Sequence, residues 1–115
     1  MNKKVGAFGE EVSEKFLINK GYKILHTNYK TKIGEIDIIA RKDNVICYIE
    51  VKTRRSSKFG MPCEAVNNKK QKVYRMVASQ HVKHYVNKFI DFRFDVIEVV
   101  LKNRKCYIRH LENAF

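Results

Sequence analysis

Two short segments of alternating polar and apolar residues hold the side chains best suited to chemistry in this sequence. Glu35 and Asp37 lie on the first segment, and Glu50 and Lys52 lie on the second. The Asp-Asn dipeptide at 43–44 is typical of a tight turn, and a two-residue turn there pairs residues whose numbers add to 87. In this register Asp37 faces Glu50, and Glu35 faces Lys52, across two antiparallel strands.

The facing carboxylates of Asp37 and Glu50 predict a metal site. Side chains directly opposite each other lie about 5 Å apart at Cβ, and like charges in such a pair destabilise the sheet. Mg²⁺ or Mn²⁺ would remove this repulsion, because hard cations take carboxylate oxygens and keep water ligands for a substrate phosphate. Lys52 points to the same side as Glu50 and could position the attacking water or offset charge on the phosphate. This set, with Glu35 beside Lys52, predicts catalysis of phosphodiester hydrolysis.

A structural alternative stays open for the same residues. Glu35 and Lys52 can form a simple cross-strand ion pair, and Asp37 can be satisfied by a neighbouring lysine or by Asn28. The register itself follows from the opposite surface of the two segments, where a slip by one residue would move half of an apolar set into water. That set pairs Ile36 with Val51, Ile38 with Ile49, and Ala40 with Cys47.

The whole sequence predicts a single α/β domain over residues 1–115, with helices covering a mixed five-stranded sheet. The first helix has Phe8, Val12 and Phe16 at helical spacing, and Gly21 follows it as a C-terminal cap. The predicted order is α-β-β-β-α-β-β, with helices at 6–20 and about 67–86, three strands within 22–53 separated at 31–32 and 43–44, an exposed loop at 54–61, and strands at 92–101 and 106–111.

The charge of the chain predicts a polyanionic partner. Its 24 lysines and arginines exceed its 12 acidic residues, which gives a net charge of +12. We expect nucleic acid as this partner, with an anionic membrane or a ribosome as the alternatives. A basic run begins at Lys52 and has Glu64 as its one acidic residue, although such runs are more often a solvated face. The predicted nucleic-acid contacts in it are Arg54, Arg55, Lys58, Lys69, Lys70, Lys72 and Arg75.

Several other residues have simpler expected roles. His81 and His84 are three residues apart on the second predicted helix. Because no third soft ligand accompanies them, we expect ordinary, partly exposed histidines. Tyr48 falls on the side of the strand that carries Glu50, and Asp95 is expected to form a salt link with a neighbouring base.

The cysteines and the apolar runs bear on the compartment. The three cysteines, Cys47, Cys63 and Cys106, lack metal-type pairing and predict reduced thiols in a cytoplasmic protein, with Cys47 in the core. No apolar run is long enough for a transmembrane helix, so we expect no membrane association. The basic start is followed by glutamates rather than by the apolar region of a signal peptide.

A resemblance to the PD-(D/E)XK nuclease superfamily lies in two motifs, Gly34-Glu35-Ile36-Asp37-Ile38-Ile39-Ala40 and Tyr48-Ile49-Glu50-Val51-Lys52-Thr53-Arg54. Within that superfamily the sequence resembles the YraN-like family of small bacterial proteins, which are related to Holliday junction resolvases. Further likeness to this family, spread over nearly the whole chain, lies in Gly6, Gly9-Glu10, Phe59-Gly60, Pro62, Glu64-Ala65-Val66 and Arg93-Phe94-Asp95-Val96.

The resemblance implies a restriction-endonuclease-like core in which Asp37 and Glu50 bind the metal and Lys52 is the catalytic lysine. It also implies an extra carboxylate ligand at Glu10, in the Gly-Glu of the first helix. From the residues alone, Glu10 can equally belong to an acidic first turn that the helix dipole favours. Ile36 stands where the superfamily name has proline, a common departure that leaves the chemistry unchanged.

These observations together predict a cytoplasmic, Mg²⁺- or Mn²⁺-dependent nuclease acting on DNA, with branched DNA among its expected substrates. A nucleic-acid-binding protein that keeps the nuclease fold without cleaving is the first alternative, and a basic ribosome- or RNA-associated structural protein is the second. The facing pair of Asp37 and Glu50 favours the nuclease, because a pure binder has no use for it. A homodimer would suit symmetric cutting of both strands of a junction.

Overall fold

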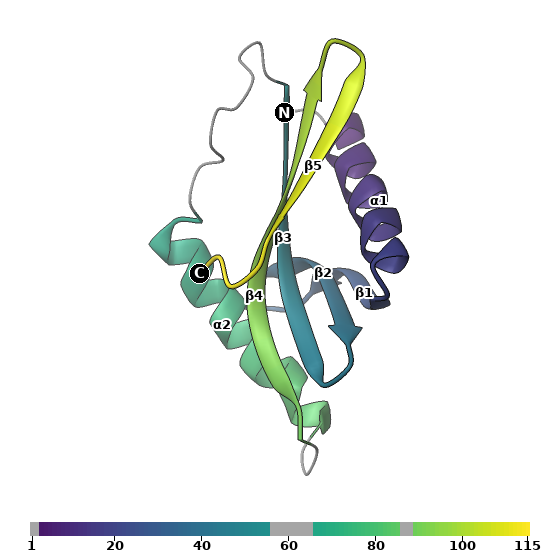
Figure 1. Ribbon diagram of the computed structural model, residues 1–115. Helices are drawn as coiled ribbons and strands as arrows, with labels where there is room; N and C mark the ends of the chain where they lie inside the picture. The colour runs from purple at the N-terminus through teal and green to yellow at the C-terminus, as the bar shows by residue number, and fades with distance from the viewer. Residues whose placement is uncertain (1–2, 56–65, 86–88) are drawn as a thin grey trace.

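The computed structural model describes residues 3–55, 66–85 and 89–115, which form a five-stranded sheet with one helix on each face (Figure 1). In chain order the elements are α1 (Lys3–Asn19), β1 (Lys23–Lys30), β2 (Glu35–Lys42), β3 (Val45–Arg55), α2 (Asn68–Val82), the short 3-10 helix η1 (Lys83–Tyr85), β4 (Asp91–Lys102) and β5 (Lys105–Leu111). The predicted element order and the mixed five-stranded sheet are confirmed. None of the helices in these ranges is long and apolar enough to cross a membrane.

The strands lie side by side in the order in which they occur in the chain, from β1 to β5. Neighbouring strands are antiparallel except for β3 and β4, which run parallel from the Val45–Asp91 pair to the Arg55–Leu101 pair. A parallel pair needs a crossover connection, and α2 lies within it. The connection carries α2 across one face of the sheet, while α1 covers the other face (Figure 1).

The β2–β3 hairpin has the predicted register. Its turn lies at residues 43–44, and the pairs from Lys42–Val45 to Ile38–Ile49 all have numbers that add to 87. The ladder ends at the Ile38–Ile49 pair, so the two strands separate before they reach the predicted acidic pairs. Glu35 pairs instead with Lys30 of β1.

Both faces of β2 and β3 are buried, which corrects the expectation that one surface is apolar and the other polar. Under α1, Ile38 and Cys47 pack with Leu17. Under α2, a second cluster contains Ile36, Ile39, Ile46, Tyr48, Tyr74, Val77, Ala78 and Phe94. The prediction for Ile36 was therefore wrong, because the alternation of β2 shifts around Asp37, where the strand leaves β3. Tyr48 is a core residue.

The face that α1 buries agrees only in part with the predicted one. Phe16 packs against the core cluster that contains Leu17, but Gly9 and Ser13 are buried and Phe8 is 44% exposed. The helix approaches β3 so closely that a Cβ atom at Gly9 would lie 1.7 Å from the side-chain oxygen of Thr53. The small residues at 9 and 13 permit this approach, which rotates the larger apolar residues toward the edges of the contact. Gly21 caps the helix as predicted, with a φ of +92°.

The β1–β2 connection is longer than the predicted break at 31–32. It runs from Thr31 to Gly34, and the Thr31 hydroxyl oxygen accepts hydrogen bonds from the backbone N–H groups of Ile33 and Gly34. A Cβ atom at Gly34 would lie 2.3 Å from a methyl carbon of Val73. The loop therefore packs directly on α2 and holds the start of β2 against that helix.

Candidate functional site

The candidate site lies where β2 and β3 separate beyond the Ile38–Ile49 pair. Asp37 fills this opening, since its Oδ2 accepts a hydrogen bond of 2.8 Å from the backbone N–H of Val51. The backbone N–H of Asp37 donates to the Tyr74 hydroxyl oxygen at 3.3 Å, which ties the strand to α2. A side-chain carboxyl group thus replaces the backbone acceptor that a continuing ladder would supply.

Glu50, on β3, is 2% exposed and contacts three side chains. Its Oε2 lies 2.6 Å from Lys70 Nζ, and its Oε1 accepts a hydrogen bond of 3.1 Å from the Tyr74 hydroxyl. It also shares a hydrogen bond with the Asp37 carboxyl group. Lys70 and Tyr74 are four residues apart, so one face of α2 supplies both partners.

The Asp37 and Glu50 carboxyl groups share a proton. Burial raises the pKa of Asp37 to about 8, and the hydrogen bond and charge of Glu50 act in the same direction. Burial also acts to raise the pKa of Glu50, but hydrogen bonds from Asp37, Lys70 and Tyr74 outweigh it and lower that pKa. Asp37 therefore donates to an ionised Glu50, and the two groups titrate as a pair. The proton lies between two carboxylate oxygens and removes the repulsion between them, as a bound metal cation would.

Glu10, on α1, lies within electrostatic reach of the same pair. Its Oε1 is buried and has no hydrogen-bond partner among the described residues, while its carboxyl group bonds to the Asn28 side chain. Burial raises the pKa of Glu10, and the charges of Glu35, Glu14 and Glu50 raise it further. The first turn of α1 has no acidic residue, so the interpretation of Glu10 as part of an acidic first turn was wrong. An unpartnered buried oxygen is unfavourable, which suits a cation ligand.

Lys52 and Glu35 both lie beyond the acidic pair, on the side away from the Ile38–Ile49 pair. Lys52 is paired in register with Glu98 of β4 and, two residues beyond Glu50 on a continuous strand, points to the face of Glu50. Glu35 lies near enough to Glu10 and Lys70 to raise the pKa of each. The predicted Glu35–Lys52 pair does not form in the β2–β3 ladder, because the strands have already separated there.

The candidate ligand atoms are of the type that a hard cation prefers. Asp37, Glu50 and Glu10 offer carboxylate oxygens, which Mg²⁺ and Mn²⁺ prefer, and one of these oxygens is buried without a partner among the described residues. In the ranges that the structure describes, no three His, Cys, Asp or Glu side chains are gathered into a metal centre. A cation at this position would displace the shared proton and compete with the Lys70 ammonium group for Glu50.

The predicted nucleic-acid contacts fall into separate groups. Two of them bind acidic residues, since Arg54 Nε lies 3.2 Å from Glu98 Oε2 and Lys70 contacts Glu50. Lys58 lies outside the described residues. The remaining four are exposed, at the end of β3 and along α2, and are Arg55, Lys69, Lys72 and Arg75. Lys70 was expected to contact a nucleic-acid backbone, but its ammonium group lies in the acidic site, against Glu50.

Residues 9–99 match the family described as Uncharacterised protein family UPF0102. The chain belongs to the UPF0102 family. A UPF0102 protein of Alkaliphilus oremlandii (strain OhILAs) is 51% identical over 117 residues, covering 100% of both chains. One of Clostridioides difficile (strain 630) is 50% identical, covering 99% of this chain and 98% of its own. One of Syntrophomonas wolfei is 41% identical over the full length of both. The resemblance to the YraN-like family is confirmed.

Sequence reasoning missed Tyr74 and misjudged His81 in this UPF0102 chain. His81 is buried, not partly exposed, and its Nδ1 lies 2.9 Å from the Tyr48 hydroxyl oxygen. Burial lowers the pKa of His81 to about 4, and the neighbouring His26 and His84 act in the same direction. The signal for both residues was the helical spacing of positions 74, 77, 78 and 81, which form the buried stripe of α2.

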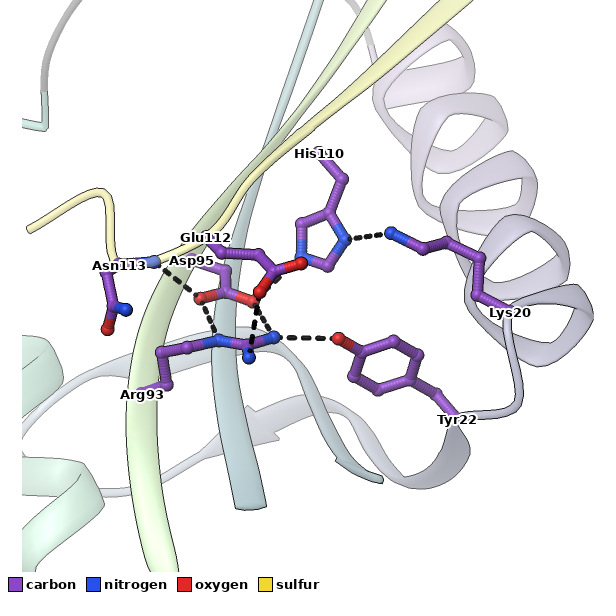
Figure 2. A network of polar contacts seen from close by, with 7 residues as sticks. All are labelled: Lys20, Tyr22, Arg93, Asp95, His110, Glu112 and Asn113. Carbon is purple, nitrogen blue, oxygen red and sulfur yellow. Dashed lines mark hydrogen bonds and ion pairs between the residues drawn. The ribbon is translucent and has the colours of Figure 1, made fainter. Parts of the chain in front are cut away.

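A second buried carboxylate, Asp95 of β4, has partners on both of its oxygens (Figure 2). Arg93 donates to them from Nε and Nη2 at 2.8 and 2.9 Å, and the backbone N–H of Asn113 donates at 3.1 Å. His110 Nε2 lies 2.7 Å from Asp95 Oδ2, and its Nδ1 lies 3.0 Å from Lys20 Nζ. Because an ammonium group can only donate, Nδ1 accepts and the ring proton is on Nε2. The expected salt link of Asp95 is confirmed.

Proposed function

We propose that this UPF0102 protein is a Mg²⁺- or Mn²⁺-dependent nuclease that hydrolyses phosphodiester bonds in DNA, branched DNA included. The observation that carries the proposal is the contact between the half-buried Asp37 carboxyl group and the buried Glu50 carboxyl group, beside a Glu10 oxygen that has no partner among the described residues. Two buried carboxylates in contact weaken a fold unless a proton or cation joins them. Lys70 balances part of the negative charge of this pair, and a bound cation would balance the rest.

Each site residue has a distinct role in this proposal. Asp37, Glu50 and Glu10 would hold the cation through their carboxylate oxygens. The metal, when bound, lowers the pKa of a water molecule and polarises a phosphoryl oxygen. Lys52, on the face of Glu50, orients the attacking water or offsets negative charge that develops on the phosphate. Tyr74 is a positioning residue, because its hydroxyl group fixes the orientation of the Glu50 carboxylate.

The charge distribution supports a polyanionic substrate. The chain carries a net charge of +12, and exposed bases follow the end of β3 and the length of α2. Contacts of this kind bind phosphates without reading bases, so binding should be nearly independent of sequence and should weaken steeply with salt. The acidic site lies beside this basic surface, since Lys70 of α2 reaches Glu50.

The test is a cleavage panel of linear, flapped, four-way and single-stranded DNA, each with Mg²⁺, Mn²⁺ or EDTA. We expect metal-dependent cleavage by the wild type and none by Asp37→Asn, which keeps the shape of the side chain but loses its charge. Asp91→Asn, an exposed acid at the start of β4, is the matched control and should cleave normally. Cleavage that persists in EDTA, or that survives Asp37→Asn, contradicts the proposal.

A non-cleaving nucleic-acid binder is the second candidate, and one observation favours it. The Lys70 ammonium group lies 2.6 Å from Glu50 Oε2 and supplies positive charge without any metal. Titration calorimetry with Mg²⁺ separates the two candidates. A nuclease gives binding heat that disappears in Asp37→Asn, whereas a binder with a permanent Lys70–Glu50 pair gives none and binds DNA equally well in EDTA.

A further inference from the structure

The first turns of α1 lie near the turn of the β4–β5 hairpin (Figure 1). A second cationic surface lies between them. We name it the basic groove, a hollow of about 590 Å³. Among the described residues that line it, none is acidic, and five carry a positive charge: Lys4, Arg55, Lys102, Arg104 and Lys105. Four of these five were not among the predicted nucleic-acid contacts, because they are far apart in the sequence and only the fold brings them together.

The hairpin places two of these charges in direct opposition. Lys102 and Lys105 are the last cross-strand pair before a two-residue turn. Both turn residues, Asn103 and Arg104, have positive φ values of 51° and 62°, as the tight turn that joins twisted strands requires. Like charges directly opposite each other destabilise a sheet. An anion bound here is attracted by both cations.

The floor of the basic groove is apolar and aromatic. Phe8 is 44% exposed and lines the groove with Val5 and Leu101. A cationic groove with an exposed aromatic ring is the arrangement with which proteins bind single-stranded nucleic acid, since phosphates bind the cations and bases stack on the ring. We propose that the basic groove binds single-stranded nucleic acid, with a base stacked on Phe8. A duplex offers only phosphates here, because its bases are stacked on each other.

The basic groove lies at a fixed distance from the acidic site. Arg55 lines the groove and Glu50 lies five residues earlier on β3, which is about 17 Å along the strand. Gly9 holds α1 against β3 between them, with Phe8 facing the groove and Glu10 facing the site. The binding of single strands by the groove is independent of the proposed nuclease function, but the role that follows for the groove rests on it. The single-stranded arm of a flapped or branched substrate would occupy the groove while its junction reaches the carboxylates.

The test measures binding without cleavage, by fluorescence anisotropy of a labelled dT12 oligonucleotide in EDTA over a series of salt concentrations. The groove variant is the double substitution Lys4→Glu and Lys105→Glu. Both changes are compatible with the fold, since the carboxylate introduced at position 105 would face Lys102 across the hairpin and a glutamate in the first turn of α1 is favoured by the helix dipole.

A matched control carries the same charge change at the opposite end of the sheet. Lys23 is exposed and pairs in register with Arg41, and Lys83 is exposed in η1, whose Tyr85 ring lies beneath the Arg41 guanidinium group. The control variant is therefore Lys23→Glu with Lys83→Glu. Any effect of lower net charge on nucleic-acid binding will be the same in the control and in the groove variant.

We expect the groove variant to bind dT12 at least about tenfold more weakly than the control. The slope of log affinity against log salt should fall by about 1.4, which is about 0.7 for each of two lost phosphate contacts to a single strand. Phe8→Leu keeps an apolar side chain but removes the ring. It should weaken binding by roughly 5- to 150-fold, the effect of losing one stacked base, with the salt slope unchanged.

Three outcomes overturn the proposal. Equal weakening in the groove and control variants would mean that net charge alone is responsible. A blunt duplex that binds as tightly as dT12, with no effect of Phe8→Leu, would show a surface for phosphates rather than for single strands. If the groove variant no longer bound vesicles with anionic lipid but still bound dT12, the groove would be a membrane-binding surface. Since EDTA removes any metal from the assay, a failure of the nuclease proposal leaves this test unaffected.

Discussion

Asp95 and Glu50 are buried carboxylates on neighbouring strands, and their surroundings differ in how the negative charge is balanced. Asp95 is 0% exposed and accepts hydrogen bonds from Arg93, His110 and a backbone N–H group (Figure 2). These contacts hold the pKa of Asp95 below its usual value, although burial opposes them. Glu50 instead meets the Asp37 carboxyl group, and its cation is a lysine with a side chain that is 50% exposed.

The difference separates a structural cluster from one that can do chemistry. Around Asp95, a rigid guanidinium fork, a histidine ring and the backbone occupy both carboxylate oxygens, so no position is left for a ligand. Around Glu50, one proton is shared and the lysine is half in solvent. In the proposed function, these are the two groups that a metal ion or a substrate would replace. Four predictions test this contrast.

The largest expected effect is on catalysis at the Asp37–Glu50 pair. Lys52→Ala should reduce the rate of DNA hydrolysis by roughly 10²–10⁴-fold, the range for losing a group that transfers a proton or orients a reactant. Metal and DNA binding should change little, because the carboxylates remain. Single-turnover cleavage at saturating metal measures this, with Lys23→Ala, an exposed lysine on β1, as the control. A rate close to that of the wild type would remove Lys52 from the mechanism.

The next largest effect is on stability at the Asp95 network. Asp95→Ala should lower the free energy of unfolding by about 3–5 kcal/mol, since it leaves the Arg93 guanidinium group, whose side chain is 16% exposed, without its main partner. Asp91→Ala, on the exposed start of the same strand, should change it by less than about 0.5 kcal/mol. Urea denaturation measures both. A loss below about 1 kcal/mol at Asp95 would mean that the network is not structural.

The two carboxylates should also give opposite dependences of stability on pH. Asp37 has a pKa raised on folding from 3.8 to about 8, so the native state holds an extra proton between these values. Stability should therefore fall as pH rises between about 6.5 and 8, by up to about 1.4 kcal/mol per pH unit. Below about pH 6.5 the pKa of His81, lowered by burial to about 4, acts in the opposite direction and offsets the fall. The pKa of Asp95 is lowered on folding, so ionised Asp95 stabilises the native state. This contribution to stability is lost as pH falls below about 4. Thermal unfolding over the acid to mildly alkaline range measures both slopes.

Asp37→Asn serves as the check on this assignment, because an amide does not titrate. It should flatten the decline between about pH 6.5 and 8 and leave the effect of Asp95 at acid pH unchanged. If the variant keeps the wild-type slope in that window, the shared proton is not on the Asp37–Glu50 pair.

The smallest expected effect concerns the lysine on Glu50. Lys70→Met keeps most of the side chain and removes the charge, and a half-exposed ion pair contributes less than about 1 kcal/mol to stability. The variant should be stabilised more by Mg²⁺ than the wild type is, because the ammonium group no longer competes for Glu50. Arg93→Met in the other network should be far more damaging. Equal losses for the two variants in urea denaturation would erase the contrast.

Much of the site follows from residue order on two strands. The turn at 43–44 fixes the β2–β3 register as far as the Ile38–Ile49 pair, and Asp37 and Glu50 meet just beyond it, where the strands separate. Glu10, expected as an extra carboxylate from family resemblance, does lie near them. These contacts are predictable because strand pairing converts sequence distance into spatial distance by simple arithmetic.

Contacts that depend on packing angles could not be obtained in this way. The approach of α1 to β3 depends on the small residue at Gly9, which moved the buried face away from Phe8. The partners of Glu50 come from a helix whose rotation is set by its own buried stripe. Lys70 was therefore predicted to contact nucleic acid, and Tyr74 was not predicted at all. Both errors arise where tertiary packing, rather than local pattern, decides which side chains meet.

The one parallel strand pair has a consequence for the order in which the molecule assembles. The antiparallel pairs are joined by connections of four, two and two residues, whereas 35 residues lie between the end of β3 and the start of β4. Closing this long connection is the entropically demanding step, and contacts so distant in sequence form late. Lys70 and Tyr74 lie inside it. We therefore expect folding to bring Asp37 and Glu50 together in a local hairpin first, before α2 docks and supplies the Lys70 ammonium group to Glu50.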